Sequence, residues 1–84
     1  MYRNKIQKGG DDMNKIELEI MMKRHGDTQS MLANAIGLSR VRLNAKINET
    51  NGASFTQPEI SAIKERYNLS DSDINAIFFE RNVS

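Results

Sequence analysis

The feature that most limits how this chain can fold is a pair of short helical segments separated by only three residues. Apolar spacing predicts a helix over residues 29–36 and another over residues 40–47. Gly37 follows the first segment and suits a left-handed turn, and Ser39 can cap the second segment. Two short helices joined in this way form a helix-turn-helix pattern.

Three further helices are expected. The first covers residues 14–24, where two apolar spacings fit an amphipathic helix: Ile16/Ile20 and Leu18/Met21/Met22. The next opens at Thr56-Gln57-Pro58-Glu59, a capping box with proline in the first turn, and runs to about Tyr67. The last opens at Ser70-Asp71-Ser72-Asp73, with Ile74, Ile77 and Phe78 facing inward.

No segment shows the period-two alternation of a strand, so the sequence predicts an all-α fold of five short helices in one domain. Residues 13–80 are expected to form this domain, and residues 81–84 a frayed tail. We expect residues 1–12 to be a disordered leader and Met13 to be the native start, because a ribosome-binding sequence followed by a start codon can encode Lys8–Met13. Residues 1–12 are then either a translated leader or an artefact of where the start was assigned. The chain has no cysteine, which excludes a disulfide-stapled domain or a zinc finger.

Charge is distributed unevenly along the chain, although the formal net charge is only +1. Residues 28–48 contain three basic side chains and no carboxylate, whereas residues 50–84 carry three basic and five acidic ones. A basic, acid-free segment of this kind favours an anionic partner, and a solvated helix face is the alternative.

The sequence of residues 28–48, TQSMLANAIGLSRVRLNAKIN, resembles the helix-turn-helix of lambda-type phage repressors and their Cro counterparts. The matching residues are Gln29, Leu32-Ala33, Ile36-Gly37-Leu38-Ser39 and Leu43. The stretch from Gly37 to Phe79 is also similar to a subgroup of small repressor-like proteins from phages and mobile elements of Gram-positive bacteria. One departure is Lys46, which stands where many relatives have leucine.

The resemblance implies a compact five-helix, lambda-repressor-like DNA-binding domain in which the second and third helices form the helix-turn-helix. The third helix would then enter the major groove with its N-terminal residues facing base edges. Arg40 is the expected reader of guanine, and the alternative is a solvated arginine. Asn44 would pair with adenine or touch phosphate. Val41 would contact a thymine methyl group or pack against the preceding helix.

The resemblance also implies contacts with the DNA backbone. The residues expected to make them are Gln29, Ser39, Arg42, Lys46 and Asn48.

The implied function is sequence-specific binding of double-stranded DNA by a transcriptional regulator, most simply a phage or prophage repressor in the cytoplasm of a bacterial host. A homodimer on a palindromic operator is expected, with Phe79 as the candidate for self-association, because adjacent Phe78 and Phe79 cannot both be buried on one narrow stripe.

No enzyme, metal, cofactor, small-molecule ligand or membrane span is expected. The chain lacks a glycine-rich phosphate loop and a second ligand for its only histidine, and its apolar runs, such as residues 20–22, are only a few residues long. The alternative function is a repressor-like protein-interaction module, an antirepressor or adaptor, that does not itself read DNA.

Overall fold

The computed structural model describes residues 13–79. The expected leader (residues 1–12) and tail (residues 81–84) lie outside the described residues. Within residues 13–79 all regular structure is helical, as the sequence predicted, and no strand is present. The elements are α1 (Lys15–Arg24), α2 (Gln29–Ile36), α3 (Arg40–Asn48), the short 3₁₀ turn η1 (Thr50–Gly52), α4 (Gln57–Tyr67), α5 (Asp71–Ile74) and the π-helical turn η2 (Asn75–Phe79).

The five helices enclose one hydrophobic core to which every α-helix contributes. Its buried side chains are Leu18, Met22, Leu32, Ala33, Leu43, Ile47, Ile60, Ile63, Tyr67, Leu69, Ile74, Ile77 and Phe78. The half-buried ring of Phe55, from the loop before α4, packs edge-to-face on Phe78 with ring centroids 5.5 Å apart. The loop is thereby anchored to the core.

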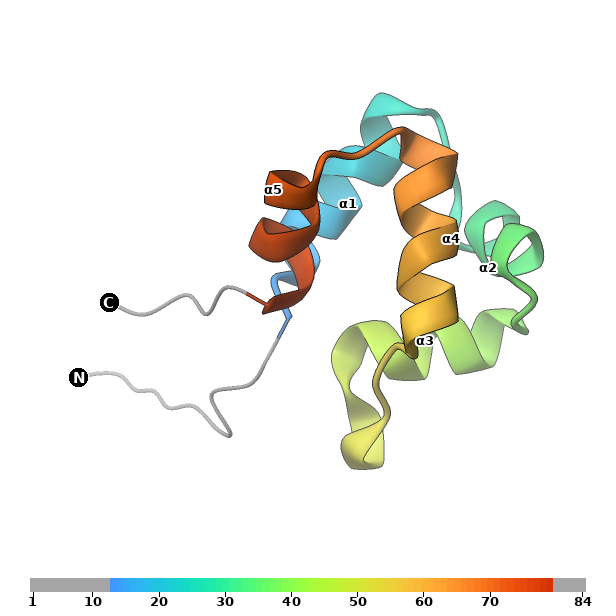
Figure 1. Ribbon diagram of the computed structural model, residues 1–84. Helices are drawn as coiled ribbons and strands as arrows, with labels where there is room; N and C mark the ends of the chain where they lie inside the picture. Colours follow the sequence, from blue (N-terminus) through green and yellow to red (C-terminus); the bar gives the residue numbers. More distant parts are fainter. Residues whose placement is uncertain (1–12, 80–84) are drawn as a thin grey trace.

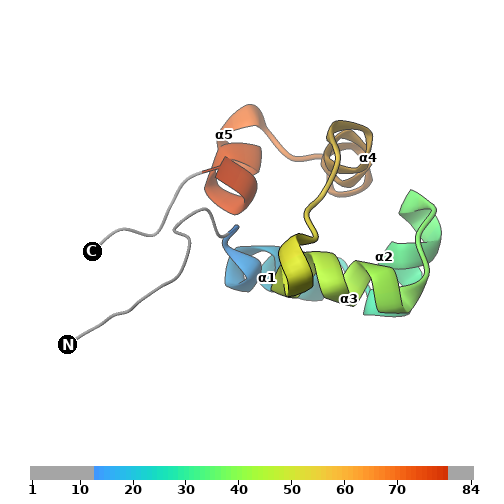
Figure 2. The ribbon, with the colours of Figure 1, turned by 90° about the horizontal axis from the view of Figure 1, so that it is seen from below.

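The helices are arranged so that α3 lies along one side of the molecule. Figure 1 shows α4 standing across α3, with α2 beside both, and α1 and α5 together at the other end. From the side of α3, as in Figure 2, this helix lies in front of α1 and beside α2. The face of α3 that points away from the core therefore forms part of the outer surface on that side of the protein.

Local capping explains where most helices begin. Each of four N-cap side chains accepts a hydrogen bond from a backbone N–H in the first turn of its helix: Asn14, Thr28, Ser39 and Ser70. The capping box at Thr56 is complete, because Thr56 accepts from the amide of Glu59 and the Glu59 carboxylate accepts from the amide of Thr56. The box at Ser70 is closed in the same way by Asp73.

Two local predictions need correction. Of the two apolar spacings on α1, only Leu18 and Met22 are buried, and Ile16 and Ile20 are exposed. The reason is geometric, because Ile16 lies two residues, or about 200°, from Leu18 around the helix. The last helix is α-helical only to Ile74 and continues as the wider turn η2.

Candidate nucleic-acid interface

The turn between α2 and α3 is set by local hydrogen bonds. Gly37 has φ +81°, in the left-handed region that L side chains rarely adopt, and it ends α2. The amide of Leu38 donates to the carbonyl oxygen of Ala33 at 2.8 Å. One residue later, the hydroxyl of Ser39 accepts from the amide of Arg42 at 3.1 Å and starts α3. The direction of α3 relative to α2 is thus fixed within three residues.

Buried side chains hold the two helices against each other and against the core. Leu32 and Leu43 are fully buried, one on each helix, and Ala33 beside Leu32 is almost so. Because residues three or four apart share a face of a helix, burial of Leu43 and Ile47 turns the opposite face of α3 outward.

That outward face carries the three side chains predicted to read bases. Arg40, Val41 and Asn44 are all exposed, and together with Gln29 of α2 they line one shallow depression between the two helices. The structure therefore gathers these four sequence-predicted residues at a single place. Since residues 28–48 contain no carboxylate, this segment adds only positive charge to the depression.

Val41 had two possible environments. Its side chain is 79% exposed, so it does not pack against α2. A branched apolar side chain is thus exposed in the same depression as Arg40, a combination suited to a partner surface with both polar and methyl groups.

The side chains predicted to touch the DNA backbone do not all lie where the sequence suggested. Ser39, Arg42 and Asn48 are exposed, and Gln29 is half-buried in the first turn of α2. Lys46 is the exception and requires a correction. Its side chain is only 7% exposed, and its ammonium donates to the Oε1 atom of Glu59 at 2.7 Å. An ammonium held inside the protein by a carboxylate does not face a phosphate.

The reason for this error lies in α4. Glu59 belongs to the capping box at the start of α4, and its Oε1 atom accepts from both the amide of Thr56 and the ammonium of Lys46. Burial alone would raise the pKa of Glu59, but these hydrogen bonds outweigh it and lower the pKa below its ordinary value of 4.5. The pair joins α3 to α4.

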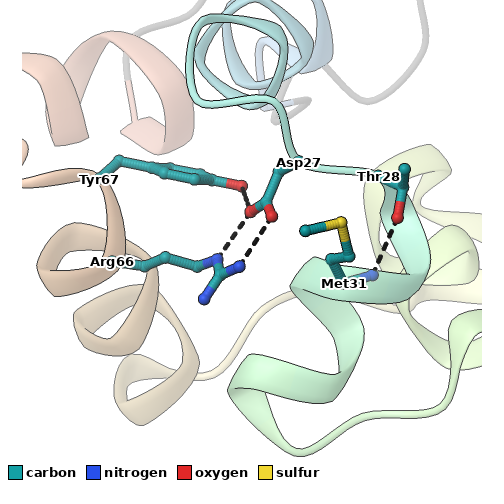
Figure 3. Close-up of polar contacts among 5 residues, drawn as sticks. All are labelled: Asp27, Thr28, Met31, Arg66 and Tyr67. Carbon is teal, nitrogen blue, oxygen red and sulfur yellow. Dashed lines mark hydrogen bonds and ion pairs between the residues drawn. The ribbon is translucent and has the colours of Figure 1, made fainter.

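A second polar cluster was missed by the sequence analysis and lies between the loop before α2 and the end of α4 (Figure 3). The carboxylate of Asp27, 3% exposed, accepts two hydrogen bonds from the guanidinium of Arg66, at 2.6 and 2.7 Å, and one from the hydroxyl of Tyr67 at 2.6 Å. The hydrogen bond from Arg66 is the main reason why the pKa of Asp27 is lowered, and it exceeds the opposing effect of burial. Burial and the bond to Asp27 raise the pKa of Tyr67 well above its usual range.

This cluster fixes the loop from which α2 starts. Asp27 directly precedes Thr28, whose hydroxyl caps α2 by accepting from the amide of Met31. Arg66 and Tyr67 lie at the end of α4, and Tyr67 also stacks on His25 at 4.8 Å. Nothing in the sequence indicated the contact, because Asp27 and Arg66 are separated by 39 residues.

The expectation for the two adjacent phenylalanines is confirmed. Phe78 is buried and Phe79 is 55% exposed. Phe79 borders a depression lined in part by Met13, Phe55 and Ile60, on a different part of the surface from Arg40.

Within residues 13–79, no three histidine or acidic side chains come together as they would around a metal ion. None of the helices in this part of the chain combines the length and apolar character needed to cross a membrane. Comparison of the chain with protein-family models, with curated proteins and with solved structures finds no significant match.

Proposed function

We propose that this protein binds double-stranded DNA sequence-specifically, with α2 and α3 acting as a helix-turn-helix and α3 entering the major groove. The observation that carries the proposal is the single exposed depression formed by Gln29, Arg40, Val41 and Asn44. Side chains on the outward face of a groove-bound helix are the ones that reach base edges.

The chemistry of this surface supports the proposal. A guanidinium can donate to O6 and N7 of guanine together, an amide can contact either bases or phosphate, and an exposed valine can meet a thymine methyl group. Ser39 and Arg42 flank these groups and are suited to phosphate contacts, which supply much of the affinity and make it depend on salt. Lys46 is left out of the proposed interface because it is paired with Glu59.

The proposed role is transcriptional regulation, most simply repression by occluding a promoter. One recognition helix reads few base pairs, so specificity against a genome favours two copies of the protein on a palindromic site. Phe79 is the proposed point of self-association, because its ring is exposed beside a depression that is lined in part by apolar side chains.

The decisive experiment measures binding to duplex DNA by fluorescence anisotropy, with competitor DNA present. The DNA upstream of the gene and sites selected from a randomised library serve as probes. Arg40→Ala should cost about 1–3 kcal/mol of binding free energy, concentrated at one base position. Arg40→Lys should lose most of the base preference while keeping the charge, because an ammonium cannot make the paired contact.

Arg42→Ala is the matched control on the same helix. It should weaken binding to all sequences about equally and lower the slope of log K against log salt by about 0.9. If Arg40→Ala changed neither the affinity nor the base preference, the proposal would be wrong.

The second candidate function is a protein-interaction module, and the exposed ring of Phe79 favours it. In that case the depression around Phe79 would bind another regulator, and Arg40→Ala would leave binding of that regulator intact. Because Phe79 and Arg40 border separate depressions, substitutions at the two sites distinguish the two functions.

A further inference from the structure

A chain of hydrogen bonds runs from α1 to the candidate base-reading surface of α3. The ammonium of Lys15 donates to Oδ1 of Asn48 at 2.8 Å. The amide nitrogen of Asn48 in turn donates to the backbone oxygen of Asn44 and to its Oδ1 atom, both at 3.0 Å. Lys15 is thereby connected to Asn44 through Asn48.

The donor and acceptor inventory fixes the orientation of both amides. A lysine ammonium can only donate, so it must face the oxygen of the Asn48 amide and not its nitrogen. The two N–H groups of Asn48 are then directed at the two oxygens of Asn44. A flipped Asn48 would place its nitrogen against the ammonium and its oxygen against two acceptors.

Asn44 therefore has its side-chain oxygen already engaged, whereas its amide nitrogen has no partner among residues 13–79. Pairing with adenine requires both halves of the amide: the oxygen accepts from N6 and the nitrogen donates to N7. In this structure adenine would have to share Oδ1 with Asn48. Adenine N7 can still accept from the Asn44 amide nitrogen, but its N6 donor is left with only the shared oxygen. Guanine presents two acceptors, N7 and O6, to the N–H groups that Asn44 offers.

The geometry points to Asn44 as a specificity residue that acts chiefly as a donor and therefore favours guanine over adenine, and to Lys15 and Asn48 as the positioning residues that impose this preference. This inference rests on the proposed function, because it concerns which base the same surface reads.

The test measures relative affinities for duplexes that differ at one base pair. The wild-type protein first selects sites from a randomised library, and Asn44→Ala identifies the position at which base preference is lost. Affinities for the guanine, thymine and adenine versions of that position are then compared for each variant.

Asn48→Ala frees Oδ1 of Asn44, so the affinity for adenine relative to guanine should rise about fivefold, within the range of a well-formed paired contact. Lys15→Met should raise the same ratio by a smaller factor, since Asn48 is then free to turn. A uniform loss of contacts with the DNA backbone would not change the ratio of adenine to guanine affinity. Lys23→Met, which removes the same charge from the other end of α1, is the control and should leave the ratio unchanged.

The arrangement can also be observed without DNA. In the NMR spectrum of the free protein, Lys15→Met should shift the side-chain amide signals of both Asn48 and Asn44, whereas Lys23→Met should not.

The outcomes separate this inference from the proposed function. A wild-type protein without sequence preference on any duplex would overturn both. A wild-type protein that reads DNA but shows the same adenine-to-guanine ratio after Asn48→Ala would overturn the inference alone.

Discussion

Removal of the ammonium of Lys46 is expected to destabilise the fold and to leave DNA contacts unchanged. In the structure the Lys46 and Glu59 side chains are 7% and 15% exposed, with 2.7 Å between Nζ and Oε1. Breaking a fully buried ion pair by removing one partner costs about 3–5 kcal/mol. Glu59 would still accept from the amide of Thr56 and retain some solvent contact. We therefore expect Lys46→Met to cost about 2 kcal/mol, below that range.

A double-mutant cycle isolates the pair. Glu59→Gln keeps the capping function, because glutamine also serves at this position of the box. Replacing both partners removes both buried charges, so Lys46→Met/Glu59→Gln should be less costly than the sum of the single variants. The coupling free energy should be about 2 kcal/mol.

The assay is urea unfolding followed by circular dichroism at the helical band. With a slope of about 1 kcal/mol per molar urea, as in small domains, Lys46→Met should lower the midpoint by roughly 2 M. The matched control is the exposed pair Lys64–Asp71, whose side chains are 42% and 92% exposed. The corresponding cycle at Lys64 and Asp71 should show no measurable coupling, because exposed pairs contribute little.

Two results would refute this reasoning. One is a coupling free energy between Lys46 and Glu59 within about 0.5 kcal/mol of zero, the usual limit of additivity. The other is a decrease in the salt dependence of DNA binding after Lys46→Met equal to the decrease expected after Arg42→Ala. That result would mean that Lys46 contacts phosphate, as the sequence suggested.

Three further predictions concern the loop before α2, the turn and the exposed ring. Asp27→Asn should destabilise the protein at neutral pH by about 1–3 kcal/mol through loss of charged hydrogen bonds. Because the pKa of Asp27 is lowered on folding from its ordinary value of 3.8, its contribution is present above that value and is lost as the pH falls through the folded-state pKa. The loss of stability in acid should therefore be shallower for Asp27→Asn than for the wild-type protein. Identical acid unfolding curves for the two proteins would contradict this role of Asp27. Gly37→Ala should cost about 1 kcal/mol in urea unfolding, since a Cβ at Gly37 meets no atom within 4 Å and only the positive φ opposes it. Phe79→Asp should shift the protein towards monomer in sedimentation equilibrium without lowering its thermal midpoint, and an unchanged association constant would exclude Phe79 from self-association.

Much of the fold was predictable because the signals that specify it are local. Caps and capping boxes act over three residues, apolar stripes over three or four, and the turn at Gly37 over five. The sequence therefore placed the helices to within a residue or two and put Phe78 inside and Phe79 outside. The resemblance placed Arg40, Val41 and Asn44 on the outward face of this helix, with packing of Val41 against the preceding helix as the alternative, and all three side chains are exposed.

Contacts between residues that are distant in the chain were decided only by the tertiary structure. Whether Ile16 or Leu18 of α1 faces the core depends on which neighbours cover the helix, and periodicity cannot choose between two apolar ridges. Lys46 is a polar residue at a buried position, and only the docking of α4 brings Glu59 to it.

The sequence by itself determined the helices, their ends and the outward face of α3, because hydrogen bonds within a turn specify them. Tertiary packing decided which polar side chains from separate elements form hydrogen bonds with one another. Lys15 reaches Asn48 across 33 residues, and Asp27 reaches Arg66 across 39. Hydrogen-bond direction at such contacts depends on where separate helices come to rest, and that is fixed only when the whole core is packed.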